Sequence, residues 1–350
     1  MTITPDTLLQ HERLIIRTNS LVDQSVRTLT ARWATAWEEI SDEWATTIGD
    51  ITATQASGEP LHPGQIAQMG RVQAALEHTA AQLDELTAGI PDAVDAPLAD
   101  IIKDTAEATR EVIASQLPED YELAYPFAQI NPTSYDWIIA RTGERMYAAS
   151  WPLTDDAVAA MKKTLLRAVP AGWGPGKTAE VMLDRVRTGF NGGLSRALTI
   201  ARTELLDAHR AAFHHTNQQT TDVLAGWVWT TKLDSQTCPA CIAMHGTLHT
   251  LDTPGPIGHP NCRCVGIPKT KTWAELGFTT PEEPADMLPD ADAWIRDNPT
   301  QARRALGDTR YRMLQDGQIS RDQLATRREN PDWRPSMQPT PVRDLERSTR

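Results

Sequence analysis

The sequence predicts an α+β protein that is mainly α-helical, with a helical N-terminal region followed by a helical domain that carries a small β-rich, zinc-knuckle-like subdomain. Two observations predict the helices: residues 7–48 contain neither proline nor glycine, and residues 194–218 repeat apolar side chains at helical spacing. The third observation is that all four cysteines fall within residues 238–264, in a segment rich in glycine, proline and histidine. Thiols clustered in this way are typical of a loop that is held by a metal ion.

The charge and the apolar content of the chain exclude some classes of function. The 350 residues carry a formal net charge of −12, although the last fifty hold eleven arginines and seven acidic residues and are therefore basic. A protein that coats nucleic acid nonspecifically needs a positive net charge, so that class is excluded, while a local basic patch is not. Because no signal peptide and no apolar run of roughly eighteen residues is found, we expect a protein that is made or assembled in a cytosol and has no membrane contact.

The first region, residues 1–120, is predicted to form a helical hairpin or bundle. A break at residues 58–64 separates its first helix from a second over 65–88, and a third covers 97–116. In the first helix, apolar side chains recur at steps of three and four, namely Trp33, Trp37, Ile40, Trp44 and Ile48. Such a stripe predicts packing in the protein's own core. The alternative is that it contacts a partner subunit, since tryptophan is enriched at interfaces.

The rest of the chain divides into four further regions. Residues 121–225 begin with a linker and continue as helices, with predicted breaks at 170–176 and at Asn191-Gly-Gly193. The aromatic and β-branched residues from Trp227 onwards then predict a strand. The expected regions after the linker and helices are a β-rich Cys/His knuckle (226–270), short helices (271–330, including one at about 320–326) and a disordered tail (331–350).

The cysteines form two pairs whose spacing fits one metal ion. Cys238 and Cys241 make a C-x-x-C turn, and Cys262 and Cys264 make a C-x-C pair whose side chains share one face of a strand. Twenty residues separate the pairs, as in ribbon-like zinc sites. His259 lies three residues before Cys262, so the ligands of a structural zinc are either the four cysteines or a set in which His259 replaces one of them. A site with four protein ligands is closed and has no open position for catalysis.

Enzymatic motifs are largely absent. The segment that ends in Gly176-Lys177-Thr178 lacks the first glycine of a phosphate-binding loop, and Cys238-Pro-Ala-Cys241 lacks the H-x-E of a zinc deaminase. The remaining enzymatic alternative is a zinc-scaffolded DNA nuclease of the HNH type, in which His259 and Asn261 would act. No carboxylate adjoins His259 to hold a catalytic metal ion, so the sequence predicts a protein that is not an enzyme.

These residues resemble the head-morphogenesis domain of phage Mu F-like minor head proteins. The resemblance is carried by Ile200-Ala-Arg-Thr-Glu204, by Trp227-Val-Trp229, by Thr237-Cys238 with Cys241, and by His259-Pro-Asn-Cys262-Arg-Cys264. It extends over about residues 135–330. Within it, Arg202 and Glu204 are expected to form an ion pair or a cap on the helix surface, and the alternative is that they brace the long helix against the knuckle.

The resemblance implies a minor capsid protein of a tailed phage or prophage that acts in virion assembly. The expected partners are the phage portal protein and the capsid or scaffold proteins, with DNA contact inside the capsid as a further expectation. The expected location is the virion, in the capsid interior or at the portal vertex, and the host cytoplasm during assembly.

Overall fold

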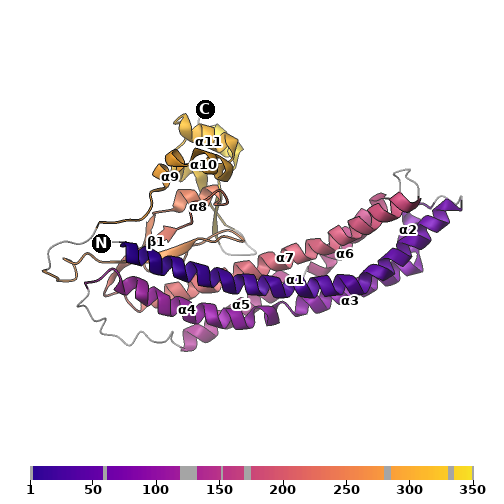
Figure 1. Ribbon diagram of the computed structural model, residues 1–350, viewed down its shortest axis with the longest axis horizontal. Coiled ribbons are helices and arrows are strands. Elements are labelled where there is room, and N and C mark those ends of the chain that lie inside the picture. Colours follow the sequence, from indigo (N-terminus) through magenta and orange to yellow (C-terminus); the bar gives the residue numbers. More distant parts are fainter. Residues whose placement is uncertain are drawn as a thin grey trace. The chain divides into compact units, whose positions relative to one another are not determined.

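The computed structural model confirms a mainly helical α+β fold (Figure 1). It describes residues 3–57, 61–118, 132–150, 153–168, 175–279, 285–329 and 335–348. The chain forms two compact units, each assembled from separate segments. Unit 1 contains Met1–Ser20, Ala99–Ile139 and Leu206–Arg350, and unit 2 contains Leu21–Leu98 and Ala140–Leu205. The regions expected from the sequence are consecutive, whereas each unit combines segments that are far apart in the chain.

Helices make up most of the first two thirds of the chain. They are α1 (Pro5–Ala56), α2 (Pro63–Gln68), α3 (Gly70–Ala88), the 3-10 turn η1 (Pro91–Ala93), α4 (Asp95–Ala114), α5 (Pro132–Ser150), α6 (Leu153–Ala168) and α7 (Pro175–Gln218). The predicted second helix is interrupted at Met69, whose backbone is extended. The predicted linker before α5 lies outside the described residues.

The tryptophan stripe of α1 packs in the core of unit 2. Trp33 and Trp44 are fully buried, and each indole N–H donates a hydrogen bond, Trp33 to the Phe190 carbonyl at 3.3 Å and Trp44 to Thr79 Oγ1 at 2.9 Å. Trp37, which is half-buried, contacts the ring of Phe190 with a centroid distance of 5.4 Å. The interpretation of the stripe as core packing is therefore confirmed.

The break predicted at Asn191-Gly-Gly193 is wrong, because α7 continues through it. Two glycines of this helix, Gly189 and Gly193, allow close packing. A Cβ atom on Gly189 would lie 3.1 Å from the Met161 Cα, and one on Gly193 would lie 3.3 Å from the Leu153 side chain. Glycine at these two positions lets α6 and α7 approach each other within unit 2.

A three-stranded antiparallel sheet in unit 1 carries the later part of the chain. Its order is β2 (Leu248–His249), β1 (Leu224–Thr230), β3 (Val265–Thr270), and Trp227 and Trp229 of the central strand are buried. At the other edge of β3, the buried side chain of Gln116 donates to the Pro268 carbonyl at 2.8 Å and accepts from the Thr270 N–H at 3.2 Å. The C-terminal end of α4 is thereby joined to the sheet.

Two buried histidines join elements of unit 1: His11 connects α1 with the sheet, and His209 connects α7 with α4. Thr230 Oγ1 donates to the Val265 carbonyl, so it accepts from His11 Nε2 at 3.1 Å. Thr105 Oγ1 donates to a carbonyl of its own helix and accepts from His209 Nδ1 at 2.8 Å. Burial lowers the pKa of His11 to about 4 and that of His209 to about 3, so both rings are neutral in the folded protein near pH 7.

The last part of unit 1 is a small module with its own core, which we call the C-terminal module (residues 285–329 and 335–348). Its elements are α9 (Ala291–Asp297), α10 (Pro299–Leu306), α11 (Asp308–Gln315), the 3-10 turn η3 (Arg321–Leu324), β4 (Ala325–Arg328), β5 (Ser336–Pro339) and α12 (Val342–Ser348).

Two expectations about the C-terminal module are corrected. The last short helix, expected at about 320–326, is instead the turn η3 followed by strand β4. The expected disordered tail, residues 331–350, is structured over 335–348. There β5 pairs with β4, and Leu345 of α12 is buried. This pairing satisfies backbone hydrogen-bonding groups of the segment, whose polar, proline-containing composition alone does not predict folding.

Two alanine substitutions in α7 test the close packing of unit 2. Gly189→Ala is expected to destabilise the protein by about 1–3 kcal/mol, because the new methyl group meets the Met161 backbone. Gly192→Ala, three residues away, is expected to stabilise it by about 1 kcal/mol, because the site is open and alanine has the higher helix propensity. Chemical denaturation measures both, and equal effects at the two positions would contradict the packing role.

The buried histidines predict that the folded protein loses stability at acidic pH. As the pH falls from 6.5, the unfolded chain takes up protons that neutral His11 cannot bind until about pH 4. The stability that this residue contributes is therefore complete above pH 6.5 and declines towards pH 4, by about 3 kcal/mol. His11→Gln keeps an N–H donor for Thr230 without titrating, and should lose less stability over this range. Denaturation curves at several pH values measure the difference; parallel pH profiles would contradict the assignment.

Candidate metal centre

The structure brings the five predicted ligand residues together in unit 1. Cys238 is the N-cap of α8 (Pro239–Met244), where its sulfur accepts from the Cys241 N–H at 3.3 Å. A proline at the first helical position favours the start of a helix there. Cys262 and Cys264 lie just before β3, and His259 lies in the loop that leads to them.

The distances between the candidate ligand atoms suit a tetrahedral ion. Cys241 Sγ lies 3.1 Å from Cys238 Sγ and 3.6 Å from Cys262 Sγ. His259 Nε2 lies 3.0 Å from Cys238 Sγ and 3.7 Å from Cys241 Sγ. With metal–sulfur bonds of about 2.3 Å, two ligands of a tetrahedral zinc are separated by roughly 3.5–3.8 Å. The side chains are thus nearly in position to hold one ion.

Within the described residues, two overlapping groups could hold a metal ion. One contains Cys238, Cys241 and His259, and the other contains Cys241, Cys262 and Cys264. Cys241 belongs to both groups and therefore occupies the centre of the cluster. Each group supplies three ligand atoms that lie within 4.8 Å of one another, and the ligand sets that the sequence left open differ in whether His259 or Cys264 completes the site.

The loop between His259 and Cys262 depends on two unusual backbone positions. A Cβ atom on Gly258 would lie 2.4 Å from Cys262 Sγ, so only glycine leaves room for this thiol. Asn261 has a φ of 61°, the left-handed conformation that asparagine tolerates better than most residues. These positions bend the chain so that His259 and Cys262 face the same point.

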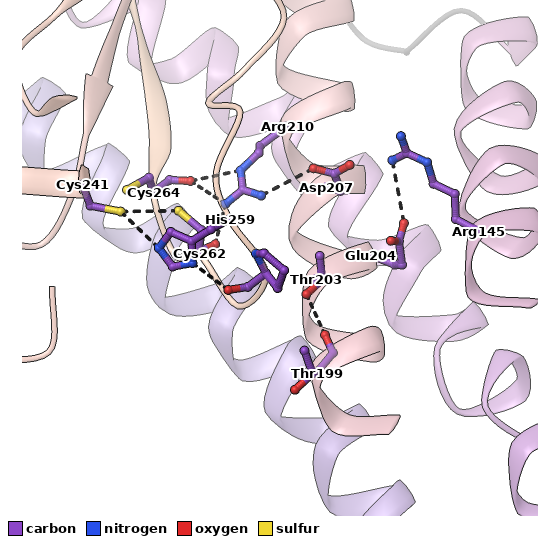
Figure 2. A network of polar contacts seen from close by, with 11 residues as sticks. Arg145, Thr199, Thr203, Glu204, Asp207, Arg210, Cys241, His259, Cys262 and Cys264 are labelled. Atoms are coloured by element: carbon purple, nitrogen blue, oxygen red, sulfur yellow. Dashed lines mark hydrogen bonds and ion pairs between the residues drawn. The ribbon is translucent and has the colours of Figure 1, made fainter. Parts of the chain in front are cut away.

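Arg210 of α7 binds the backbone of the segment that carries Cys262 and Cys264 (Figure 2). Its guanidinium is buried and donates to the Cys262 carbonyl at 2.5 Å and to the Cys264 carbonyl at 3.1 and 3.2 Å. Asp207, one turn earlier, lies 3.5 Å from the same guanidinium. The brace between the long helix and the knuckle, the alternative role considered for Arg202, is therefore made by Arg210.

A signal for Arg210 was present in the sequence but was missed. Leu206, Phe213 and Asn217 follow one helix face at steps that include position 210, and all three are buried. An arginine within such a stripe indicates a buried guanidinium, which requires several acceptors. The carbonyls of the ligand segment meet that requirement.

The cluster stabilises charged sulfur. Hydrogen bonding with Cys241 and with His259 lowers the pKa of the Cys238 thiol to about 5. Hydrogen bonding with Cys241 also holds the pKa of Cys262 well below its usual value, and the charge of Arg210 acts in the same direction. The contact with Cys238 raises the pKa of His259 to about 9. Hydrogen bonding with Cys238 raises the pKa of Cys241, and burial raises that of Cys264, so the thiolate form that binds metal ions is favoured at Cys238 and Cys262 only.

Apolar side chains enclose the thiols. Phe213, Trp227 and Trp229 pack against Cys241, Cys262 and Cys264 in one buried cluster. Arg263 points out of the cluster, as its spacing predicts, and lies 3.8 Å from Asp234. A cavity of about 90 Å³ beside the thiols is lined by Cys238, His259 and Asn261 among others, so the site is reached from this side.

Substitution of the candidate ligands tests the site. Purified chain is expected to bind one equivalent of added zinc. His259→Ala should weaken zinc binding by more than the roughly 10- to 100-fold that is usual for outer-shell residues, because Nε2 faces both thiols of the α8 pair. Cys264→Ala, the matched variant, should retain the stoichiometry. Metal analysis and chelator competition measure both, and the reverse pattern would make Cys264 the fourth ligand.

Comparison with known proteins identifies this region. Residues 159–267 match the model of a family described as Phage Mu protein F like protein. The match includes Arg210 and all five candidate ligands, whereas the C-terminal module lies outside it. No curated protein and no solved structure matches the chain. The resemblance predicted from the motifs is thereby confirmed over a shorter stretch than expected, and residues 159–267 of the chain are similar to the Phage Mu F-like proteins.

Proposed function

We propose that the protein is a structural component of phage head morphogenesis. The observation that carries this proposal is the Phage Mu protein F like match, which covers the metal cluster and the arginine that braces it. The site itself also supports a structural role, because its donors are thiols and an imidazole that face inward and are packed with tryptophan. An assembly factor needs such a rigid, closed element more than it needs reactive groups.

The proposed partners are the phage portal protein and the capsid or scaffold proteins, with contact to DNA inside the capsid as a further proposal. The proposed location is the virion, at the capsid interior or the portal vertex, after assembly in the host cytoplasm. The helices of the described residues include none that is long and apolar enough to cross a membrane.

The ion that we propose is a structural zinc held by Cys238, Cys241, Cys262 and His259. Three thiolates and one imidazole are a usual donor set for closed zinc sites. His259 is preferred to Cys264 because its Nε2 already lies within 3.7 Å of two sulfurs. Its Nδ1 lies 2.7 Å from the Pro260 carbonyl, a contact that orients the ring, as outer-shell partners of zinc-binding histidines do.

A zinc-scaffolded nuclease of the HNH type fits the site less well. In such an enzyme, His259 would have to be free to act as a base near a second, carboxylate-bound metal ion. In this structure its Nε2 faces Cys238 and Cys241, and the potential metal groups of the described residues contain only cysteine and histidine. The carboxylate of Asp234, which precedes the first cysteine pair, lies 3.8 Å from Arg263.

Analysis of phage particles tests the proposed function. The chain should be found by mass spectrometry in purified heads, in a low and fixed ratio to the major capsid protein, with cross-links to the portal protein. Particles made with a Gly258→Ala chain should contain less of it, because that substitution disrupts the metal loop, whereas Gly192→Ala should leave the ratio unchanged. Absence of the chain from particles and from assembly intermediates would exclude the proposal.

A further inference from the structure

Helix α8 contacts two different parts of unit 1. Its N-terminal end carries two candidate ligands, Cys238 as N-cap and Cys241 in the first turn. The rest of the helix contacts the C-terminal module, which lies outside the family match. Figure 1 shows α8 close to α9 and α10. The six-residue helix is therefore shared between the metal cluster and a part of the chain that supplies none of the candidate ligands.

The C-terminal end of α8 is capped by Arg321 of the module. One guanidinium nitrogen, Nη1, donates to the carbonyls of Ile242, Ala243 and His245, each at 3.0 Å. These carbonyls lack partners within so short a helix. Asp292 of α9 lies 3.0 Å from Arg321 Nε, on the other side of the same guanidinium.

The middle of α8 forms part of the module's core. Ile242 and Ala243, which directly follow Cys241 in the helix, are buried among apolar side chains of the module, to which each of its helices contributes. These are Ala291, Ile295, Ala302, Leu306, Met313, Ile319, Leu324 and Leu345. Without a helical α8, this core would lose two of its members and the module would lose its contacts with this helix.

The module also reaches the metal cluster directly through β5. The Met337 N–H donates to the Ile257 carbonyl at 2.8 Å, and the Met337 side chain packs against the cluster that contains the thiols. Three residues later, the Thr340 carbonyl accepts from Arg310 at 2.8 Å. Residues 335–348 thus span from the ligand loop to the module's core.

From these contacts we infer that metal binding at the knuckle and docking of the C-terminal module are coupled, each favouring the other. A helix of six residues is unstable in isolation and depends on what holds its two ends. The ligands fix its N-terminal end, and Arg321 with the module's core fixes the remainder. Coupling between two such sites is reciprocal: if the metal tightens module docking by some factor, the docked module tightens metal binding by the same factor.

The first arm of the test removes the metal from the intact chain. This inference rests on the proposed metal centre, so the zinc content of the purified protein is measured first. The zinc is then removed with a chelator, and amide hydrogen exchange is followed along the chain. Exchange in residues 291–324 and 335–348 should rise by about tenfold or more, a typical coupling factor, while exchange in the unit 2 part of α3 should not change.

The second arm weakens the docking and measures metal affinity. Arg321→Met keeps the length of the side chain and removes the donors to the α8 carbonyls. Its zinc affinity, from chelator competition, should fall by about the same factor as in the first arm, with a stoichiometry of one. Arg304→Met is the matched control, an exposed arginine of the same module, and should bind zinc like the parent protein. Hydrogen exchange of unit 2 in each variant shows whether the rest of the chain is folded.

The possible outcomes distinguish a failure of the coupling from a failure of the proposed metal centre. Absence of zinc in the folded protein would refute the metal centre and the inference together. Bound zinc with unchanged exchange in the module after chelation, or unchanged zinc affinity in Arg321→Met, would refute the coupling and leave the metal centre intact.

Discussion

The arrangement of unit 1 depends on the buried guanidinium of Arg210. A charged group at this depth is stable only if its N–H donors are satisfied, and here they are satisfied by the backbone carbonyls of Cys262 and Cys264. This fixes the segment that carries two thiols relative to α7 before any side chain binds an ion. The same contact places a positive charge beside Cys262 and favours its thiolate. One interaction thus sets both the position and the charge of the ligand segment.

The two units use different physical solutions for close packing. Unit 2 is a helical assembly whose core contains tryptophans from α1 and whose helices approach at glycines of α7. Unit 1 has a more polar interior, in which histidine, threonine, glutamine and arginine side chains join helices to strands. Polar contacts of this kind are directional, so they specify one arrangement of the segments where apolar contacts would tolerate several.

Much of the fold and of the site could be predicted from local patterns. The three- and four-residue spacing of Trp33, Trp37 and Trp44 predicted a buried helix face, and the paired cysteines predicted the cluster. What could not be predicted depended on tertiary contacts. Asn191-Gly-Gly193 indicates a break unless one knows that Leu153 and Trp33 pack against Gly193, and the proline-containing tail indicates disorder unless β4 is available for pairing. The spacing of the residues in the sequence also could not decide whether His259 or Cys264 completes the site, because both lie within reach of Cys241.

The contact between Gln116 and β3 has a consequence for a protein that works among many neighbours. Its amide oxygen and nitrogen occupy the hydrogen-bonding positions at Pro268 and Thr270 that an added strand would use. An exposed sheet edge invites pairing with another chain, and in a crowded assembly such pairing is a route to aggregation. With this edge closed by a side chain from α4, β3 cannot recruit a further strand at these positions. At this edge, any association with another chain would have to use side chains, which discriminate between partners in a way that backbone pairing does not.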